Sequence, residues 1–337
     1  MPMRVFEVDV EDDEAFADWF GPFHASDVEA WPDLPGWLPG ELRAIARRRD
    51  DATWVLGCVA DDGGATVGSS ISRVAKLDNL DVVETFALCV HPQHRRRGAG
   101  SAMLRWIESL AADLGRATLV ASTEVNLALE DTAGEAFAQQ AGFERALASS
   151  RRELRLPVDP SLLDRLEAEA RPHAADYELT TWTNGCPAAY VEGRLDLASG
   201  MSTDTPHGEL DFDEEHWDEQ RLRGQEGVTA AMDRDSFAAG ALHRPTGTLV
   251  AFTEIAISRV DPSAGWQQDT IVHTDHRGHR LGILVKVANL RAAAASSPQT
   301  TRVCTWNADE NEPMVRVNEL FGFKRVARCA MWQRKTT

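Results

Sequence analysis

The stretch VHPQHRRRGAG, Val90 to Gly100, has three consecutive arginines and two glycines directly after an apolar run. A second stretch, VHTDHRGHRLG, Val272 to Gly282, repeats its valine, both histidines, an arginine and the final glycine at matching positions. The shift is 182 residues (272 − 90 = 182). One Arg-rich, Gly-containing loop alone is compatible with a solvated turn, but a recurrence at matching positions favours a functional one.

A second landmark repeats in the same order. Gly142-Phe143 lies in FAQQAGFERA and Gly322-Phe323 in NELFGFKRV, 180 residues apart (322 − 142 = 180). A shared order with nearly equal spacing indicates gene duplication, and the period is too long for a solenoid. We therefore predict an N-terminal domain at residues 1–156, a linker at 157–176 that contains a short helical pattern, and a C-terminal domain at 177–337.

Length and composition narrow the class of protein. The 337 residues favour about two domains, and 43% are hydrophobic, enough for ordinary cores. The formal charge of −18 argues against nonspecific binding to nucleic acid, whose phosphates repel it. The five cysteines are scattered without CxxC spacing, which predicts neither a disulfide framework nor a zinc or other metal site. The acidic N-terminus and the lack of a long apolar run predict a cytoplasmic protein without a membrane partner. We expect a monomer or a homodimer.

Both halves show the same succession of elements. In each, a predicted hairpin precedes a strand, the basic turn, an amphipathic helix and a buried strand. In the first half the helix places Met103, Leu104, Ile107, Leu110 and Leu114 on one face. The pattern is typical of an α/β unit. A helix that begins directly after the turn presents unpaired N–H groups and the positive end of its dipole, and Gly98 and Gly100 leave an anion room to reach them.

The chain thereby resembles the GNAT (GCN5-related N-acetyltransferase) family. ETFALCVHPQHRRRGAG is similar to the family's motif A and AFAQQAGF to its motif B. TIVHTDHRGHRLG and TWNADENEPMVRVNELFGF resemble the C-terminal domain of tandem GNAT proteins of actinobacterial type. The resemblance covers essentially the whole chain. It implies two tandem GNAT domains of the α/β class, each a mixed, mostly antiparallel sheet flanked by helices, with a splayed central strand pair.

The resemblance implies acetyl-CoA as the cofactor and places its contacts. The implied pyrophosphate loops are Arg95, Arg96, Arg97, Gly98, Ala99, Gly100 and Ser101 in the first half, and Arg277, Gly278, His279, Arg280, Leu281 and Gly282 in the second. The implied pantetheine contacts are Leu88, Cys89, Val90, Ile271 and Val272, and further CoA contacts are Asn307 and Asn311. Arg280 stands where the motif has glycine; a positive φ there costs arginine about 1 kcal/mol.

The candidate catalytic groups are carboxylates. The family often has a glutamate six positions before the motif A valine, where this chain has Glu84. The second half has Trp266 there, so the role needs another residue: Asp269 is the nearest strand carboxylate, and Glu254 lies on the preceding hairpin. A charge on an edge strand facing solvent is the alternative for Glu84. The family's tyrosine acid is replaced by Ala138 and Asn318, so water or another group protonates the thiolate, or one half is not catalytic.

The acidic segment His207–Gly227 falls where the family shapes its acceptor site, and it would attract a cationic amine. The alternative is a solvated helical face. We predict an acetyl-CoA-dependent N-acetyltransferase that acts on a small-molecule amine, which is cationic if this segment lines the site. The alternatives are a CoA-binding module with little turnover, an enzyme similar to mycothiol synthase, and a protein acetyltransferase. Release of thiol from acetyl-CoA with a panel of amines separates a module from an enzyme.

Overall fold

The computed structural model describes residues 3–48 and 50–336, and these form two compact units. Unit 1 comprises the residues up to Ser149, His207–Asp213, and the residues from Ala327 onward. Unit 2 comprises Ser150–Pro206 and Glu214–Val326. Each unit therefore contains segments from both halves of the sequence.

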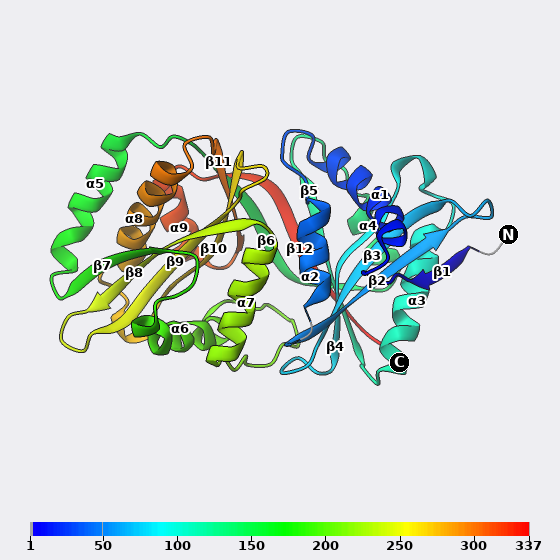
Figure 1. The fold of residues 1–337 in the computed structure, drawn as a ribbon, viewed down its shortest axis with the longest axis horizontal. Coiled ribbons are helices and arrows are strands. Elements are labelled where there is room, and N and C mark those ends of the chain that lie inside the picture. The colour runs from blue at the N-terminus through cyan, green and yellow to red at the C-terminus, as the bar shows by residue number, and fades with distance from the viewer. Residues whose placement is uncertain (1–2, 49, 337) are drawn as a thin grey trace. The chain divides into compact units, whose positions relative to one another are not determined.

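Unit 1 is a mixed sheet with helices on both faces (Figure 1). Its strand order is β1-β2-β3-β4-β5-β12, and only the β4–β5 pair is parallel. The strands are β1 (Arg4–Glu7), β2 (Ala52–Ala60), β3 (Thr66–Ala75), β4 (Val82–Val90), β5 (Thr118–Asn126) and β12 (Lys324–Lys335). Helices α1 (Asp13–Ala30) and α2 (Pro39–Arg47) cover one face, α3 (Ala99–Asp113) covers the other, and α4 (Ala133–Gln140) follows β5.

Local sequence explains these elements. Asp61 accepts hydrogen bonds from the amides of Gly63 and Ala65, and Gly64 takes φ 83°, so the β2–β3 hairpin turns where Asp-Asp-Gly-Gly predicts. The side chain of Asp12 caps α1 by accepting from the amides of Glu14 and Ala15.

Unit 2 repeats this arrangement. Its strand order is β6-β11-β10-β9-β8-β7, and the β10–β11 pair is parallel. The strands are β6 (Glu144–Arg155), β7 (Tyr177–Thr183), β8 (Arg234–His243), β9 (Thr248–Ser258), β10 (Ala264–Val272) and β11 (Arg302–Ala308). Helices α5 (Pro160–Ala170) and α8 (Leu281–Ser296) pack on one face of the sheet, while α6 (Val191–Asp204) and α7 (Glu219–Ala231) belong to the other, and α9 (Glu312–Phe321) follows β11. Two short 3₁₀ turns, Arg171–His173 and Ala188–Tyr190, flank β7.

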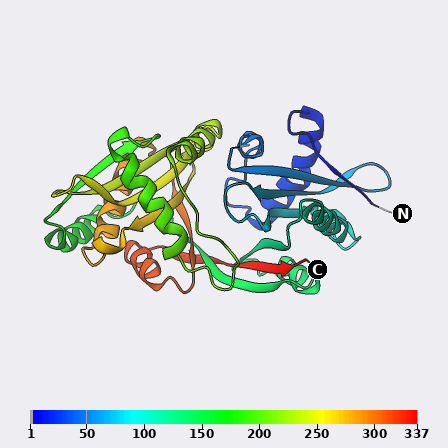
Figure 2. The same cartoon turned by 90° about the horizontal axis from the view of Figure 1, so that it is seen from below.

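The last strand of each half is exchanged between the units. β12 pairs with β5 over its length from Ala327↔Asn126 to Lys335↔Thr118, which places the end of the second half in unit 1. β6, the last strand of the first half, enters unit 2 at Ser150. In Figures 1 and 2 the red β12 can be followed to the C-terminus within unit 1.

The predicted mixed, mainly antiparallel sheet flanked by helices is confirmed, and so is the splayed strand pair. β4 pairs with β5 only from Val82↔Thr118 to Thr85↔Ala121, although β4 continues to Val90. β10 pairs with β11 only from Ala264 to Trp266, although it continues to Val272. The predicted limits at residues 156 and 176 concern the duplicated sequence and stay a prediction; within 157–176, α5 gives Leu163 and Leu166 to the core of unit 2.

Candidate functional site

The basic turn of unit 1 joins β4 to α3. A short 3₁₀ turn, Pro92–His94, precedes Arg95, whose Nε–H donates to the Val90 carbonyl at 3.2 Å. The Arg95 guanidinium also pairs with Glu29, and with Asp131 at 3.8 Å. Arg96 and Arg97 are exposed, and α3 begins at Ala99. In the part of the chain that the structure describes, no acceptor meets the amides of Gly98, Ala99, Gly100 or Ser101.

The basic turn of unit 2 is built in the same way. It has a 3₁₀ turn, Thr274–His276, and Arg277 Nε–H donates to the Val272 carbonyl at 3.3 Å. The Arg277 guanidinium pairs with Asp204 at 2.6 Å. His279 Nδ1 lies 3.0 Å from the His173 carbonyl, and α8 begins at Leu281. Among residues 3–48 and 50–336, the amides of Gly278 to Gly282 likewise meet no acceptor.

Both turns contain two residues in the left-handed region, at corresponding positions. In unit 1 these are Arg96 (φ 61°) and Gly98 (φ 93°), and in unit 2 they are Gly278 (φ 87°) and Arg280 (φ 54°). Each turn thus has one glycine and one arginine there, in exchanged order. Arg280 does adopt the positive φ that costs a residue with a Cβ about 1 kcal/mol, and Arg96 shares that cost.

The donor set of both turns fits the pyrophosphate of CoA. A helix N-terminus with unpaired amides binds phosphate oxygens, and a Cβ on Gly98 or Gly278 would enter space with no atom within 4 Å. Leu88, Cys89 and Val90 lie on β4 beyond its pairing with β5, and Ile271 and Val272 lie on β10 beyond its pairing with β11. Those strand ends are the expected pantetheine contacts. Burial raises the pKa of the Cys89 thiol to about 12, so it is a thiol and not a thiolate nucleophile at neutral pH.

The two expected asparagines have roles within unit 2. Asn311 Oδ1 accepts from the Met314 amide at 3.3 Å and so caps α9. Asn307 Oδ1 on β11 accepts from Asn318 Nδ2 at 2.7 Å. Because both side-chain oxygens are engaged, the side chains of Asn307 and Asn311 can contact CoA only as donors, through Nδ2. Asn318, at the position of the family's tyrosine, is fully buried, and Ala138 in unit 1 is buried too.

Unit 2 contains a cavity of about 180 Å³ on the α6 and α7 side of its sheet. Trp182 and Phe252 stack at 5.8 Å between ring centroids and form an apolar wall. The charged groups of the lining come from α6, α7 and the strands, and they are Arg194, Glu226, Arg234, Glu254, Arg259 and Asp269. Glu226 is already engaged, because it accepts from the Cys186 amide at 2.7 Å and pairs with Arg223 at 2.8 Å. Arg259 pairs with Asp233 and Asp235.

Glu254, Asp269 and Arg194 form the polar centre of this lining. Asp269 pairs with Arg194 through Nη2 at 3.4 Å. Within the described ranges, no hydrogen bond or ion pair satisfies the Glu254 carboxyl, which is half-buried. Burial raises the pKa of Glu254 to about 7; nearby Arg194 opposes the shift, and Asp269 and Glu226 add to it. Glu254 is therefore divided between acid and carboxylate near neutral pH.

A buried network holds the strand beneath these groups. β10 has a bulge between Gln267 and Thr270. Gln267 Nε2 donates to the Glu254 carbonyl at 2.6 Å and to Thr253 Oγ1 at 3.0 Å, and it accepts through Oε1 from Lys286 Nζ at 3.1 Å. Lys286 is 2% exposed, and burial lowers its pKa to about 7. The network links α8 to the bulge at which Asp269 lies.

The corresponding face of unit 1 is filled. Val90 pairs with Gly68 as Val272 pairs with Ala251; three residues further along β3 and β9 stand Ile71 and Glu254. Counting back three and four residues from the valines, Ala87 corresponds to Asp269 and Phe86 to Gln268. Because Leu56 pairs with Ile71 as Ala238 pairs with Glu254, Trp54 corresponds to Ser236. Ile71 is fully buried in the cluster around Trp19, and Phe86 packs edge-on against Trp37 and Trp54.

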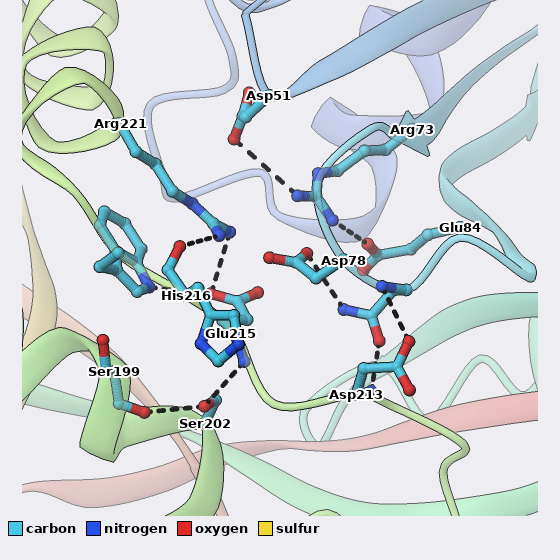
Figure 3. A network of polar contacts seen from close by, with 12 residues as sticks. Asp51, Arg73, Asp78, Glu84, Ser199, Ser202, Asp213, Glu215, His216 and Arg221 are labelled. Carbon is cyan, nitrogen blue, oxygen red and sulfur yellow. Dashed lines mark hydrogen bonds and ion pairs between the residues drawn. The ribbon is translucent and has the colours of Figure 1, made fainter.

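Glu84 lies on β4 opposite Arg73 of β3. The two side chains are 3.6 Å apart, and Arg73 also reaches Asp51 at 3.9 Å (Figure 3). The position that corresponds to Glu84 in unit 2 is Trp266, because Ala256 pairs with Trp266 as Arg73 pairs with Glu84. Glu84 therefore belongs to an ion-paired group in unit 1, and its catalytic role stays a prediction.

Most of the acidic segment does not line the cavity: Leu222, Gln225 and Glu226 at its end do, whereas its other carboxylates do not, namely Glu209, Asp211, Asp213, Glu214, Glu215, Asp218 and Glu219. In unit 1, Asp211 pairs with Lys335, and Asp213 exchanges two hydrogen bonds with Asn79 (Figure 3). In unit 2, Glu215 pairs with the buried Arg221 at 3.1 Å. These carboxylates hold the segment in place. The cavity's carboxylates are Glu226 of α7, which belongs to the segment, Glu254 of β9 and Asp269 of β10.

Two residues of the cavity lining were not predicted as main site residues: Arg194 was not named from the sequence, and Glu254 was named only as a carboxylate on the preceding hairpin. Arg194 lies three residues after Val191 and three before Leu197, so it shares the buried face of α6. Glu254 is the only charged residue in the strand TLVAFTEIAIS. Both signals are visible in hindsight as charges within apolar patterns. In residues 3–48 and 50–336 no helix combines the length and apolarity needed to cross a membrane. The same ranges contain no group of three or more His, Cys, Asp or Glu suited to a metal ion.

Comparison with known proteins agrees with this geometry. The acetyltransferase (GNAT) domain family matches residues 51–145. No curated protein matches the sequence. A tandem GNAT protein from the clavulanic acid biosynthesis pathway is similar over 99% of this chain and 98% of its own, with 25% identity and a TM-score of 0.79. A GCN5-related N-acetyltransferase from Sphaerobacter thermophilus shares the fold over 99% of this chain and 95% of its own, at 14% identity and a TM-score of 0.63.

The strand order, the splayed pairs, the two basic turns and these likenesses lead to one conclusion. Residues 51–145 match the GNAT domain family, and the chain as a whole has the tandem GNAT fold.

Proposed function

We propose that the protein is an acetyl-CoA-dependent N-acetyltransferase that acetylates a small amine in the cavity of unit 2. The GNAT fold supports acyl-CoA-dependent N-acetyl transfer in general. The observation that carries the finer proposal is the cavity itself, where Glu254 and Asp269 line a space next to the splayed end of β10. A volume of about 180 Å³ suits a small acceptor.

Acetyl-CoA supplies an acetyl thioester when bound, and the chain's residues provide the rest. The amides of Gly278 to Gly282 bind the pyrophosphate, and Arg277 adds charge beside it. Glu254 removes the proton that an attacking amine loses, which its pKa of about 7 permits at neutral pH. Asp269, held by Arg194, attracts the cationic form of the amine to the cavity. Neither Ala138 nor Asn318 supplies an acid, so the thiolate is protonated by water or by another group.

Unit 1 is the second candidate for activity, with Glu84 as its base. The filled face around Ile71, Trp54 and Phe86 favours a different role, in which unit 1 binds CoA without turnover. The donor set of its turn supports that role as well as it supports binding in unit 2. An enzyme with one reacting and one binding unit combines the two main alternatives.

Thiol release from acetyl-CoA with a panel of small amines tests the function. With a reactive amine, Glu254→Gln should lower kcat/KM at pH 7 by about 100-fold or more, because it removes a general base. Glu84→Gln should change it less than about threefold. In the wild type, kcat/KM should rise with pH through about 7 as Glu254 loses its proton, and this inflection should be absent in Glu254→Gln.

The opposite pattern, with the loss in Glu84→Gln and none in Glu254→Gln, would move catalysis to unit 1. Release of no thiol with any amine, together with CoA binding by calorimetry, would leave a binding module.

A further inference from the structure

Arg194 is an unexpected residue in the lining of a site for an amine, because its side chain is also positively charged. Its side chain comes from α6 into the lining of the unit 2 cavity and is 6% exposed. Its Nη2 reaches Asp269 at 3.4 Å, which is long for a charge-assisted hydrogen bond, and its planar head lies 4.1 Å from the centre of the Phe252 ring. Within residues 3–48 and 50–336, no acceptor meets its buried Nη1.

A buried guanidinium with an unpaired N–H donor is suited to bind an anion. Buried polar groups in folded proteins nearly always have partners, and a donor left without one is destabilising. Within the described ranges no neighbouring carboxylate meets Nη1: Asp269 pairs through Nη2, Glu226 is held by Arg223 and the Cys186 amide, and Glu254 forms no ion pair with Arg194. A carboxylate on the ligand supplies two oxygens in the planar geometry that a guanidinium matches.

The rest of the cavity limits what else this ligand contains. Glu254 and Asp269 suit an amine, and Arg194 is close enough to Glu254 to stabilise its charged form. A volume of about 180 Å³ is small, and it favours an acceptor whose amine and carboxylate are separated by a short chain. The stacked rings of Trp182 and Phe252 offer that chain an apolar surface.

We propose that the acceptor is a small amino acid, whose carboxylate binds Arg194 while its amine faces Glu254. This inference rests on the proposed function, since it names the acceptor class of the same cavity. The proposed acceptor is thus a zwitterion and not a simple cation, because the lining contains an arginine for the carboxylate as well as carboxylates for the amine.

The test compares acceptors of equal size that differ in the carboxylate. Glycine is paired with glycinamide and β-alanine with β-alaninamide, and kcat/KM is expressed per free amine. Phosphoethanolamine tests the other common anion. The wild type should prefer one carboxylate over its amide by about tenfold or more, as expected for a charge-assisted contact.

Variants assign that preference to Arg194. Arg194→Met should reduce the ratio within each pair to about threefold or less, and Arg194→Lys should restore part of it. Arg244→Met is the matched control, because this arginine pairs with Glu178 on the surface, and it should keep the wild-type ratio. If Arg194→Met lowers both members of a pair equally, Arg194 is only structural and the proposal is overturned.

Calorimetry keeps the inference separate from the proposed function. If amino acids bind better than their amides but are not acetylated, the inference holds and the proposed function fails. If neither binding nor turnover distinguishes the members of a pair in the wild type, the inference is overturned. A preference for phosphoethanolamine over both amino acids also overturns it, since the anion would then be a phosphate.

Discussion

One sheet face is filled with aromatic side chains in unit 1 and hollow in unit 2, although the strands beneath share a register. Trp54, Ile71 and Phe86 of unit 1 stand where unit 2 has Ser236, Glu254 and Gln268. Trp54 and Ile71 pack in the cluster with α1 and α2, and Phe86, which is 38% exposed, covers Trp37 and Trp54 edge-on, whereas the unit 2 set lines a cavity. The turns that face the cofactor differ far less, since both have a helix start with unpaired amides. We propose that duplication kept the cofactor side in both units and a reactive acceptor side in only one.

The largest expected effect comes from changing the basic turn of one unit at a time. Gly278→Glu places a carboxylate at the turn of unit 2 and should lower turnover by about 100-fold or more, because it repels the pyrophosphate and disturbs its amide donors. Gly98→Glu makes the same change in unit 1 and should leave turnover within about threefold, while removing one CoA from the stoichiometry measured by calorimetry.

Gly278→Ala is the control for backbone strain, because it adds a Cβ at φ 87° without charge. It should keep most of the activity. Equal loss of turnover in Gly98→Glu and Gly278→Glu would mean that both units react.

The next largest effect comes from introducing into unit 2 an aromatic residue of the filled face of unit 1. Ser236→Trp introduces the residue that unit 1 has at this position and should lower kcat/KM for the acceptor by about tenfold or more, through steric exclusion. The KM for acetyl-CoA should stay the same. Steady-state kinetics with one reactive amine measures both.

The reciprocal change, Trp54→Ser, removes aromatic packing from unit 1 and should cost about 2 kcal/mol of unfolding free energy with no loss of turnover at low temperature. If it lowers turnover instead while the protein stays folded, the face of unit 1 takes part in the reaction.

A smaller effect concerns stability and pH. Glu254 has a folded pKa of about 7 against 4.5 for the ordinary group, so the folded protein binds more protons than the unfolded chain between these values. The free energy of unfolding should therefore fall as pH rises through this window. Glu254→Gln removes the penalty and should be more stable than the wild type at pH 8 by an amount on the order of 2 kcal/mol.

Denaturant unfolding at pH 5 and pH 8 measures the difference, which should be small at pH 5. Glu84→Gln serves as the unit 1 control. A wild type whose stability relative to Glu254→Gln does not change with pH would show that Glu254 titrates normally.

The smallest effect concerns the two arginines in left-handed backbone. Arg96→Gly and Arg280→Gly should each raise the free energy of unfolding by about 0.5 to 1 kcal/mol, since glycine adopts positive φ without steric cost. Gly98→Ala should lower it by a similar amount. Unchanged stability in Arg96→Gly would mean that the side chain makes a compensating contact.

The sequence predicts the two basic turns better than the cavity of unit 2, for physical reasons. The turns around Gly98 and Gly278 are local, because a strand, a glycine and a helix start define them within about a dozen residues. The difference between Trp54 and Ser236 depends on how helices pack on a sheet, and an aromatic residue in a strand is compatible with any core. Arg194 reads as an ordinary charged helix residue until its buried face is known.

The exchange of β6 and β12 was outside the reach of sequence reasoning as well. Both strands follow a Gly-Phe pair, and the residues of β12 that contact β5, such as Trp332, would suit either sheet equally. Which sheet each strand joins depends on the tertiary path of the chain, which no local pattern contains.

The exchange of β12 also delays the pairing of β5 while the chain is synthesised on the ribosome. β5 is made early, but its antiparallel partner lies far ahead in the chain: Lys335 donates to Thr118, 217 residues before it. At the usual elongation rate the open edge of β5 waits roughly 10 to 40 s for that partner. During this interval the nascent chain exposes an unpaired strand, which is a template for pairing with other chains. Overproduction of this protein should therefore depend on chaperone capacity more than its final stability suggests.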